Sequence, residues 1–374
     1  MSGKFREAYA GLTDFVAKHP EIEIGDAVTS IPEDVRPDFY GLFNAARDAF
    51  VRDKFPTLLD RAVALKKEVD KAAEGTSGWM SLEDPPTVNP LRRFLRDPKD
   101  CLVRELFDPL FELLKGRKTI NEIEEAVSPR IEELFETVFR GGYEKWAVFS
   151  LLNLLEVKNS FRVNVRSLNT GERSKPAAQA PADEVPAPQE STRFFFSQPR
   201  NTIFAVPDFI IYSSRLNRFV GIRSEFHEAP YNALNASRER EWEAVDTELL
   251  RLLAKGLTLV YFSEKAEAIA LVADVAKFCR PDMVLYCVDA QSMNRSDAAA
   301  LMEKADRRLK PPKGSYLIAS EAWAESPETA EGPPPVPSGE KLSGIHLLSV
   351  GFERLKLLPL IEALSDTREG EMIT

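Results

Sequence analysis

Apolar residues recur at helical spacing through the first part of the chain. The clearest case lies between Ser128 and Phe139, where the i, i+3, i+4, i+7 spacing predicts an amphipathic helix. Ser128 suits the N-cap and Pro129 suits the first helical position, while Gly141 and Gly142 predict the end of the helix. Its apolar face consists of Ile131, Leu134, Phe135, Val138 and Phe139.

Neighbouring segments have the same helical character. Thr119 and Glu122 have the spacing of a capping box, and the apolar residues of Cys101–Leu114 predict another helix. Tyr143–Val157 is apolar on nearly all sides, which predicts a helix at the centre of a helical bundle. We therefore expect residues 1 to about 157 to be almost wholly helical, followed by a short strand at Ser160–Arg166.

Two proline-rich segments interrupt the pattern. Residues 169–192 lose the apolar periodicity and gather prolines among Ala, Glu and Gln, which predicts an extended linker. Residues 325–341 have a similar composition and separate two apolar runs, which predicts an inserted surface loop. The expected organisation is a helical domain at 1–168, a linker at 169–192 and a second domain at 193–374.

The pattern after the linker alternates between strands and helices. Asn201–Ser214 and Arg218–Phe226 are rich in aromatic and β-branched residues and flank a polar turn, so they predict a β-hairpin. Apolar runs at 257–262, 283–288, 315–319 and 345–350 predict further strands, with helices expected at 242–253 and 269–276. Strands joined by helices favour parallel pairing, so we expect an α/β domain with a mixed sheet of hairpin and parallel strands. The whole chain is then α+β, with an all-α first domain.

Composition and charge narrow the function classes. The chain has 374 residues, of which 44% are hydrophobic and 29% charged, with a formal net charge of -10. The acidic balance disfavours broad attraction to nucleic acid or anionic membranes, although a local basic patch remains compatible with it. The three cysteines match no disulfide or zinc pattern. The first residues carry charge and form no apolar core of signal-peptide length, and no later apolar run is long enough for a membrane span. We therefore expect a cytoplasmic protein without a membrane partner.

One pair of carboxylates is placed for metal chemistry. Asp208 follows a proline on the first hairpin strand and Glu225 lies on the second, so the two side chains could hold Mg²⁺ and orient a water at a phosphodiester. Here the chain resembles the PD-(D/E)xK nuclease superfamily, whose core is a helix, a three-strand meander, a helix and a strand. The resemblance covers residues 192–262 and implies catalytic roles for Asp208, Glu225 and Arg223. The sequence departs from the family motif at Gly221, where the acid belongs, and Arg223 stands in the place of lysine.

Other candidate sites are weaker. Ser263–Lys265 and Asp289–Gln291 follow strands, where ligands bind in doubly wound sheets, yet no glycine-rich phosphate loop accompanies them. The three histidines lie in different segments and form no catalytic motif. Arginines gather around the hairpin turn and the next helix, where they form either an anion-binding edge or a solvated mixed-charge face. The candidates for this partner contact are Arg215, Arg218 and Arg238.

These observations favour an interaction or regulatory protein of the adaptor kind, whose α/β module binds another protein without turnover and needs no cofactor. Phe352–Leu364 is a candidate docking helix, although packing on its own sheet is the use that its leucines favour. The alternative function is a divergent nuclease that uses Mg²⁺ or Mn²⁺ at Asp208 and Glu225, with Arg223 beside them.

Overall fold

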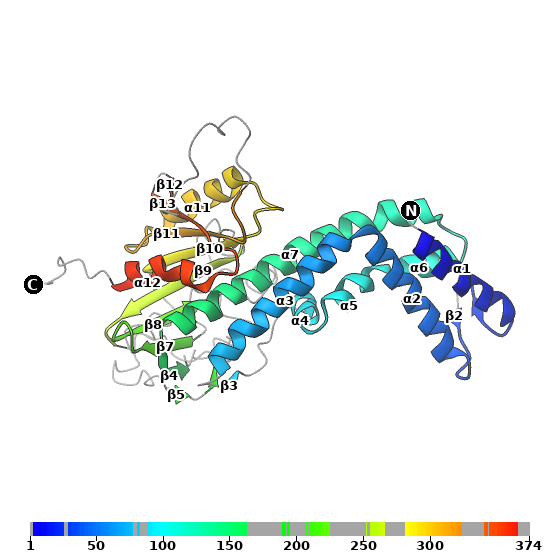
Figure 1. Ribbon diagram of the computed structural model, residues 1–374, viewed down its shortest axis with the longest axis horizontal. Helices are drawn as coiled ribbons and strands as arrows, with labels where there is room; N and C mark the ends of the chain where they lie inside the picture. The colour runs from blue at the N-terminus through cyan, green and yellow to red at the C-terminus, as the bar shows by residue number, and fades with distance from the viewer. Residues whose placement is uncertain are drawn as a thin grey trace, which may run out of the picture. The chain divides into compact units, whose positions relative to one another are not determined.

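The computed structural model confirms an α+β chain in which a helical region precedes a strand-rich one (Figure 1). The chain divides into two compact units. Unit 1 contains 1–67 and 89–142, and unit 2 contains 68–88 and 143–374. The structure describes residues 3–25, 29–77, 81–82, 89–162, 189–191, 193–194, 207, 209–224, 252, 255–265, 281–323, 340–342 and 344–365.

Unit 1 is built from helices around an aromatic core. Phe5, Phe39, Phe43 and Phe50 are almost fully buried within it. A short hairpin follows the first helix, and its two strands, β1 (Glu23–Ile24) and β2 (Thr29–Ser30), have two residues each. The helices are α1 (Gly3–Lys18), α2 (Arg36–Lys54), the first part of α3 (Pro56–Ser77), α4 (Asn89–Arg96), α5 (Pro98–Val103), α6 (Phe107–Leu114) and the first part of α7 (Ile120–Leu154).

The helix predicted at Cys101–Leu114 is divided in the structure. A short 3-10 segment, η1 (Arg104–Leu106), separates α5 from α6. Asp97 caps α5, accepting from the backbone N–H of Asp100 at 3.0 Å. The apolar pattern located the buried residues, because Leu102, Leu106 and Leu110 are buried, but it did not reveal the break.

The boundaries predicted for the helix at 128–139 are wrong. α7 runs for 35 residues without interruption, passing through Pro129 and through Gly141 and Gly142. An internal proline costs about 3 kcal/mol, but Pro129 lies on the exposed side while Ile123, Val127 and Ile131 are buried before and after it. Their burial offsets the missing hydrogen bond.

The true start of α7 is the capping box expected from the sequence. The backbone N–H of Thr119 donates to Glu122 Oε2 at 2.7 Å, and the N–H of Glu122 donates to Thr119 Oγ1 at 3.3 Å. Each side chain thus satisfies a backbone donor that the helix leaves without a partner. The accepted hydrogen bonds, from the backbone first and then the hydroxyl of Thr119, lower the pKa of Glu122.

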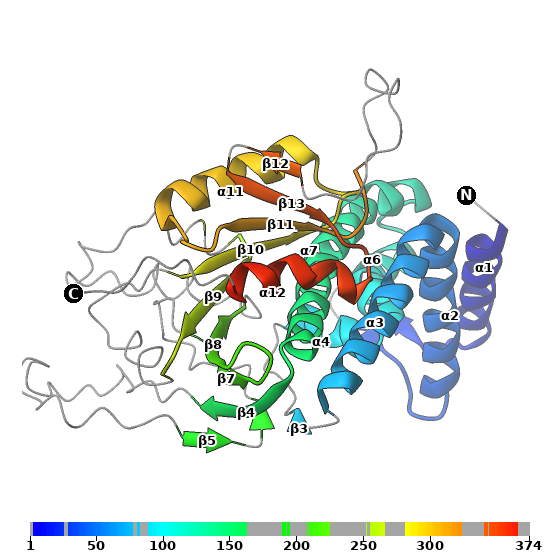
Figure 2. The same cartoon turned by 60° about the vertical axis from the view of Figure 1, so that its left-hand side comes forward.

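Unit 2 contains a mixed sheet that confirms the predicted strands (Figure 2). Among the described residues it has nine strands in the order β12-β13-β11-β10-β9-β8-β7-β4-β5. The strands are β4 (Val157–Arg162), β5 (Gln189–Ser191), β7 (Phe209–Ser213), β8 (Arg218–Arg223), β9 (Leu257–Ser263), β10 (Met283–Val288), β11 (Ser315–Ala319), β12 (Glu340–Leu342) and β13 (Ile345–Ser349). β10, β11 and β13 are parallel, and the other ladders are antiparallel.

The hairpin of β7 and β8 forms around the predicted turn, with Phe209 opposite Ile222 and Ser213 opposite Arg218. Asn217 adopts φ of 53°, a conformation that asparagine tolerates better than most residues. The strand on the other side of β7 is β4, while β6 (Arg193–Phe194) pairs with β3 (Ser81–Leu82) in a separate ladder. β6 lies at the start of the region that resembles the nuclease core, and in its described residues it pairs outside the β7–β8 hairpin.

Both faces of the sheet are covered. α11 (Arg295–Leu309) packs Ala298, Met302 and Ala305 against alternate residues of β9, β10, β11 and β13. Figures 1 and 2 show the second part of α7 and α12 (Leu358–Ser365) on the side of the sheet away from α11. A 3-10 turn, η5 (Arg354–Leu357), precedes α12. The described residues include no helix long and apolar enough to cross a membrane.

The helix segment at Tyr143–Leu154 packs with this sheet in unit 2 and not in a helical bundle, contrary to the sequence-based expectation. Thr258 Oγ1 on β9 donates to Glu144 Oε1, and the Tyr143 hydroxyl lies 2.8 Å from the carbonyl oxygen of Ala319 and 2.9 Å from that of Gly351. The ring of Trp146 stacks on Tyr143 at 5.4 Å. An all-round apolar helix is buried whatever covers it, so its composition could not distinguish helices from a sheet.

Several predictions lie partly or wholly outside the described residues. These are the helix at 269–276, most of the helix at 242–253, and most of the segments at 169–192 and 325–341. The described ends of the two proline-rich segments are strands, because β5 pairs with β4 and β12 pairs with β13. Unit 2 also takes in residues 143–162, which the sequence analysis assigned to the first domain.

Candidate functional site

The site with the best described geometry is an open groove in unit 1, which we call the α2–α6 groove. It has a volume of about 640 Å³, within the usual range of ligand pockets. α2 supplies Arg36 and Tyr40, and the chain around β2 supplies Thr29 and Ile31. The α6 side consists of Phe107, Asp108, Phe111 and Glu112, with Lys115 just after the helix.

Aromatic rings in tilted and edge-to-face contact form the wall of this groove. Phe111 lies 4.6 Å from the buried ring of Phe43 and 5.3 Å from Phe107, as measured between ring centroids. Tyr40 lies 6.1 Å from the same Phe43 ring. Phe107 is 38% exposed, which is unusual for so large an apolar side chain in the part of the chain that the structure describes. Such fixed, partly exposed rings lose little conformational entropy when a partner covers them.

A cation supports the wall from outside the groove. The guanidinium of Arg47 lies 5.3 Å from the centroid of Phe43 and 5.4 Å from that of Phe107, in cation–π geometry. Burial lowers the pKa of Arg47, although the charges of Asp100 and Asp48 act in the opposite direction. Because an arginine side chain stays protonated in proteins, Arg47 is a cation in contact with the Phe107 ring.

The end of α6 positions the charged rim. Gly116 adopts φ of 68°, and the backbone N–H of Arg117 donates to the carbonyl of Glu112 at 3.1 Å. The N–H of Gly116 donates to the carbonyl of Leu113 at 3.0 Å, which completes a Schellman motif. This turn brings the Arg117 side chain back over α6.

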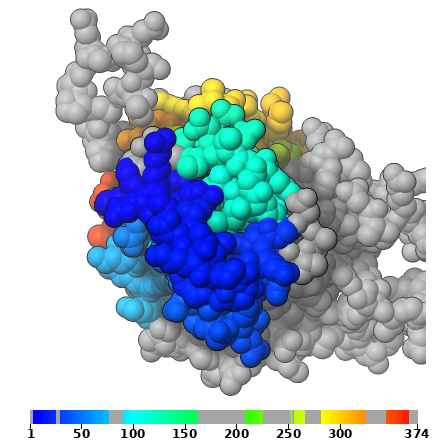
Figure 3. Space-filling model, turned by 90° about the vertical axis from the view of Figure 1, so that its right-hand side faces the viewer, coloured from blue at the N-terminus to red at the C-terminus, as the bar shows by residue number. Residues whose placement is uncertain are grey.

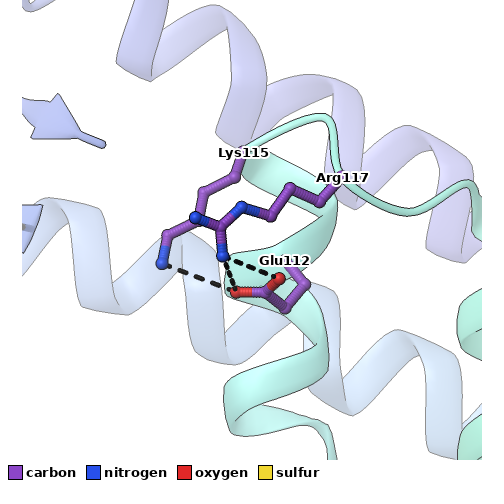
Figure 4. Close-up of polar contacts among 3 residues, drawn as sticks. All are labelled: Glu112, Lys115 and Arg117. Atoms are coloured by element: carbon purple, nitrogen blue, oxygen red, sulfur yellow. Dashed lines mark hydrogen bonds and ion pairs between the residues drawn. The ribbon is translucent and has the colours of Figure 1, made fainter. Parts of the chain in front are cut away.

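Glu112 is consequently held between two cations (Figure 4). Arg117 Nη1 lies 3.3 Å from Glu112 Oε2, and Lys115 Nζ lies 3.5 Å from Glu112 Oε1. Desolvation raises the pKa of Glu112, but the hydrogen bonds and charges of Arg117 and Lys115 outweigh it, so the pKa is lowered. The three side chains together carry one net positive charge at the rim.

Arg36 closes the opposite side of the groove. Its Nε and Nη2 donate to the carbonyl oxygen of Ile31 at 3.2 and 3.0 Å. These bonds fix the segment after β2 against α2. The groove is thus preformed by local contacts within unit 1, whose surface is shown with α1 and α2 in blue in Figure 3.

The site residues predicted from the sequence lie elsewhere or outside the described residues. Asp208, Glu225 and Arg238 fall outside them, and Arg223 is half-buried on β8 opposite Leu259 of β9. Among the described residues no group of three or more His, Cys, Asp or Glu side chains is placed to hold a metal ion.

Two of the predicted arginines flank the hairpin turn as expected. Arg218 pairs with Glu264 at 2.9 Å and donates to the carbonyl of Asn217 at 3.2 Å, while Arg215 is exposed. The Arg218–Glu264 pair places opposite charges together beside the turn, and the choice between an anion-binding edge and a mixed-charge face stays a prediction. Such an exposed pair contributes about 0.2–1 kcal/mol.

The strand-end residues have local structural partners. Asp289 is buried, and its Oδ1 accepts from Ser320 Oγ at 3.1 Å and from the backbone N–H of Gln291 at 3.3 Å. Ser263 Oγ accepts from the N–H of Lys265 at 3.2 Å. Both arrangements stabilise turns after strands.

The groove residues were not identified from the sequence. One available signal was the order of Phe111, Lys115 and Gly116, since an apolar helix end with basic residues and glycine indicates a C-cap that turns the chain back. The pairing of α2 with α6 has no comparable local signal. Comparison of the chain with protein-family models, with curated proteins and with solved structures gave no match.

Proposed function

We propose that this chain is an interaction protein that holds a segment of a partner protein in the α2–α6 groove without chemical turnover. The observation that carries the proposal is the row of aromatic side chains along the groove, Tyr40, Phe107 and Phe111. Tyrosine, phenylalanine and arginine are enriched at the centres of protein interfaces, where burial of one ring contributes a large part of the binding energy. The sequence analysis expected the α/β module to bind the partner, whereas this proposal uses a contact surface in unit 1.

The rim gives the partner segment a chemical character. Arg36 and Lys115 line the groove together with Asp108 and Glu112, so the lining charges balance. Glu112 is already paired with Lys115 and Arg117, so Asp108 is the exposed acid of the lining. The net positive charge of Glu112, Lys115 and Arg117 is the place where a carboxylate of the partner would bind. The segment expected to bind therefore has an apolar or aromatic side chain next to an acidic one.

The proposal is tested by selecting binders from a library of random peptides displayed on phage. Peptides enriched on the full chain should bind Phe107→Ala and Tyr40→Ala variants at least about tenfold more weakly, because each loses one aromatic contact. The matched control is Leu355→Ala, since Leu355 is 65% exposed and lies in unit 2. Thermal unfolding confirms that each variant is folded. Peptides that bind all variants equally, or no enrichment, would contradict the proposal.

Absence of turnover is tested separately, because the nuclease-like resemblance implies a reaction. The purified chain is incubated with labelled DNA and RNA in Mg²⁺ or Mn²⁺, beside Asp208→Ala and Glu225→Ala variants. We expect no cleavage that depends on these residues. Cleavage that is lost in both variants would establish the nuclease alternative, whereas cleavage retained in both identifies a contaminant.

A further inference from the structure

α3 has two apolar faces, and only one of them is used in the core. Ala62, Leu65 and Val69 are buried. A second stripe, Pro56, Leu59, Val63 and Ala64, lines a groove of about 540 Å³, and Val63 is 53% exposed. Apolar residues at this helical spacing normally indicate a buried surface. We call this stripe, with Arg52 of α2, Asp60 and Lys67 of α3 and Lys99 of α5, the α3 face.

The charges around the stripe are mainly positive. The α3 face contains three cations and one carboxylate, in a chain whose formal net charge is -10. Lys99 is paired with Asp48. Within the described residues, Arg52 and Lys67 have neither an ion pair nor a hydrogen bond from their side chains. Two cations therefore lie beside the apolar stripe with their charges available to a partner.

The apolar stripe and its flanking cations together favour one kind of binding partner. From Pro56 to Lys67 the stripe follows α3 for roughly 16 Å, about three helical turns. Helix-in-groove recognition uses apolar anchors at i, i+3, i+4 and i+7 over such a length. A membrane surface would require a larger apolar face with more basic residues. We propose that the α3 face docks an acidic amphipathic helix of a partner protein, independently of the α2–α6 groove.

The probe for this proposal is a fluorescein-labelled amphipathic peptide of about five helical turns, with leucines at i, i+3, i+4 and i+7 and glutamates at the remaining positions. Its reference carries lysine at each glutamate position. In fluorescence anisotropy with the full chain in about 50 mM NaCl, the acidic peptide should bind at least about tenfold more tightly than the basic one. Raising the salt concentration should weaken the binding of the acidic peptide.

Charge reversal locates the binding surface. The Arg52→Glu/Lys67→Glu variant should bind the acidic peptide about tenfold more weakly and the basic peptide more tightly. The Lys4→Glu/Arg6→Glu variant changes the net charge equally on exposed positions of α1 and should leave both affinities unchanged. Val63→Ser should weaken the binding of the acidic peptide severalfold, because the variant loses an apolar contact.

Three outcomes of the anisotropy experiments would overturn the proposal. They are failure of the acidic peptide to bind at concentrations up to its solubility limit, equal binding of the two peptides, and equal weakening in the α1 control variant. Competition with a peptide selected on the α2–α6 groove distinguishes the two surfaces, because the two peptides should bind simultaneously. If they displace one another, the α3 face is not a separate docking site.

Discussion

Gly142 lets α7 approach α3 more closely than a residue with a side chain would allow. A Cβ atom at this position would lie 2.8 Å from Leu65 Cδ2, and one at Gly141 would lie 3.0 Å from Leu91 Cδ2. Both leucines are buried, so they have little room to move. The two glycines therefore serve packing inside a continuous helix, and not its termination.

This packing predicts whether an alanine substitution raises or lowers the free energy of unfolding. Alanine usually stabilises a helix by about 1 kcal/mol relative to glycine, but overpacking a core costs about 1–3 kcal/mol. Gly142→Ala should therefore lower the free energy of unfolding by about 1 kcal/mol, as measured by urea denaturation. Gly41→Ala on α2, where a Cβ meets nothing within 4 Å, should raise it instead. Equal effects at both positions would show that close packing is not the reason for Gly142.

At the residue scale the sequence predicted side chains with local partners better than those with distant ones. The Thr119–Glu122 box is confirmed because both residues act within one helical turn. The cationic pair around Glu112 was missed although it is also local, since it depends on the left-handed turn at Gly116. The roles of Asp208 and Glu225 stay predictions, because these residues lie outside the described part of the chain.

At the scale of elements, helix ends were the least predictable feature. Every predicted strand from 257 onward is confirmed, since short apolar runs between turn residues specify a strand locally. The helix boundaries at 128 and 141 were wrong because proline and glycine end helices only where tertiary burial does not offset their cost. The order of strands in the sheet depends on long-range pairing and had no signal in the local pattern.

The end of α6 gives an element-scale prediction. Gly116→Ala places a Cβ in the left-handed region and should cost about 1–2 kcal/mol. If the strain opens the Schellman motif, Arg117 moves away from Glu112 and the groove rim changes. Peptides selected on the α2–α6 groove should then bind more weakly to Gly116→Ala. Gly11→Ala on α1 is the control, because a Cβ there has open space.

The start of α7 predicts a dependence on pH. The folded-state pKa of Glu122 is lowered, so its contribution to stability is present above the ordinary glutamate pKa and is lost as the pH falls through the folded value. The Glu122→Gln variant should be less stable than the parent at pH 7, and the difference should shrink in acid. Thermal unfolding across this range measures it. A difference that is constant with pH would mean that the carboxylate charge has no part in the cap.

At the scale of the whole molecule, Tyr143 fastens α7 to the carboxyl ends of two parallel strands in unit 2. Its hydroxyl is buried against the carbonyl oxygens of Ala319 and Gly351. Burial raises the pKa of Tyr143 well above its usual value, with smaller contributions from Cys287 and Asp289. The side chain is therefore a neutral hydrogen-bond donor at physiological pH.

Removing this hydroxyl takes one donor from the carbonyl oxygens of Ala319 and Gly351, while Ala319 keeps the backbone N–H groups of Val350 and Gly351 as donors. Tyr143→Phe should lower the free energy of unfolding by about 0.5–1.5 kcal/mol. Since the folded-state pKa is raised, the stability from Tyr143 is complete below the ordinary tyrosine pKa and is lost as the pH rises above it. Urea denaturation at neutral and alkaline pH should show a smaller alkaline loss in the variant. A parallel loss in both proteins would contradict this role for the phenol.

The continuity of α7 has a practical consequence for dissecting the molecule. A truncation after residue 168, chosen from the proline-rich composition that follows, would separate Tyr143 from Ala319 and Gly351. It would also leave Trp146 and Leu152, which are buried in the whole chain, on a fragment without the rest of unit 2. The remaining C-terminal fragment would lose both its covering helix and the interior strand β4. Such pieces would expose apolar surface and collect in inclusion bodies, so a two-part expression strategy has to keep Tyr143–Arg162 with the sheet.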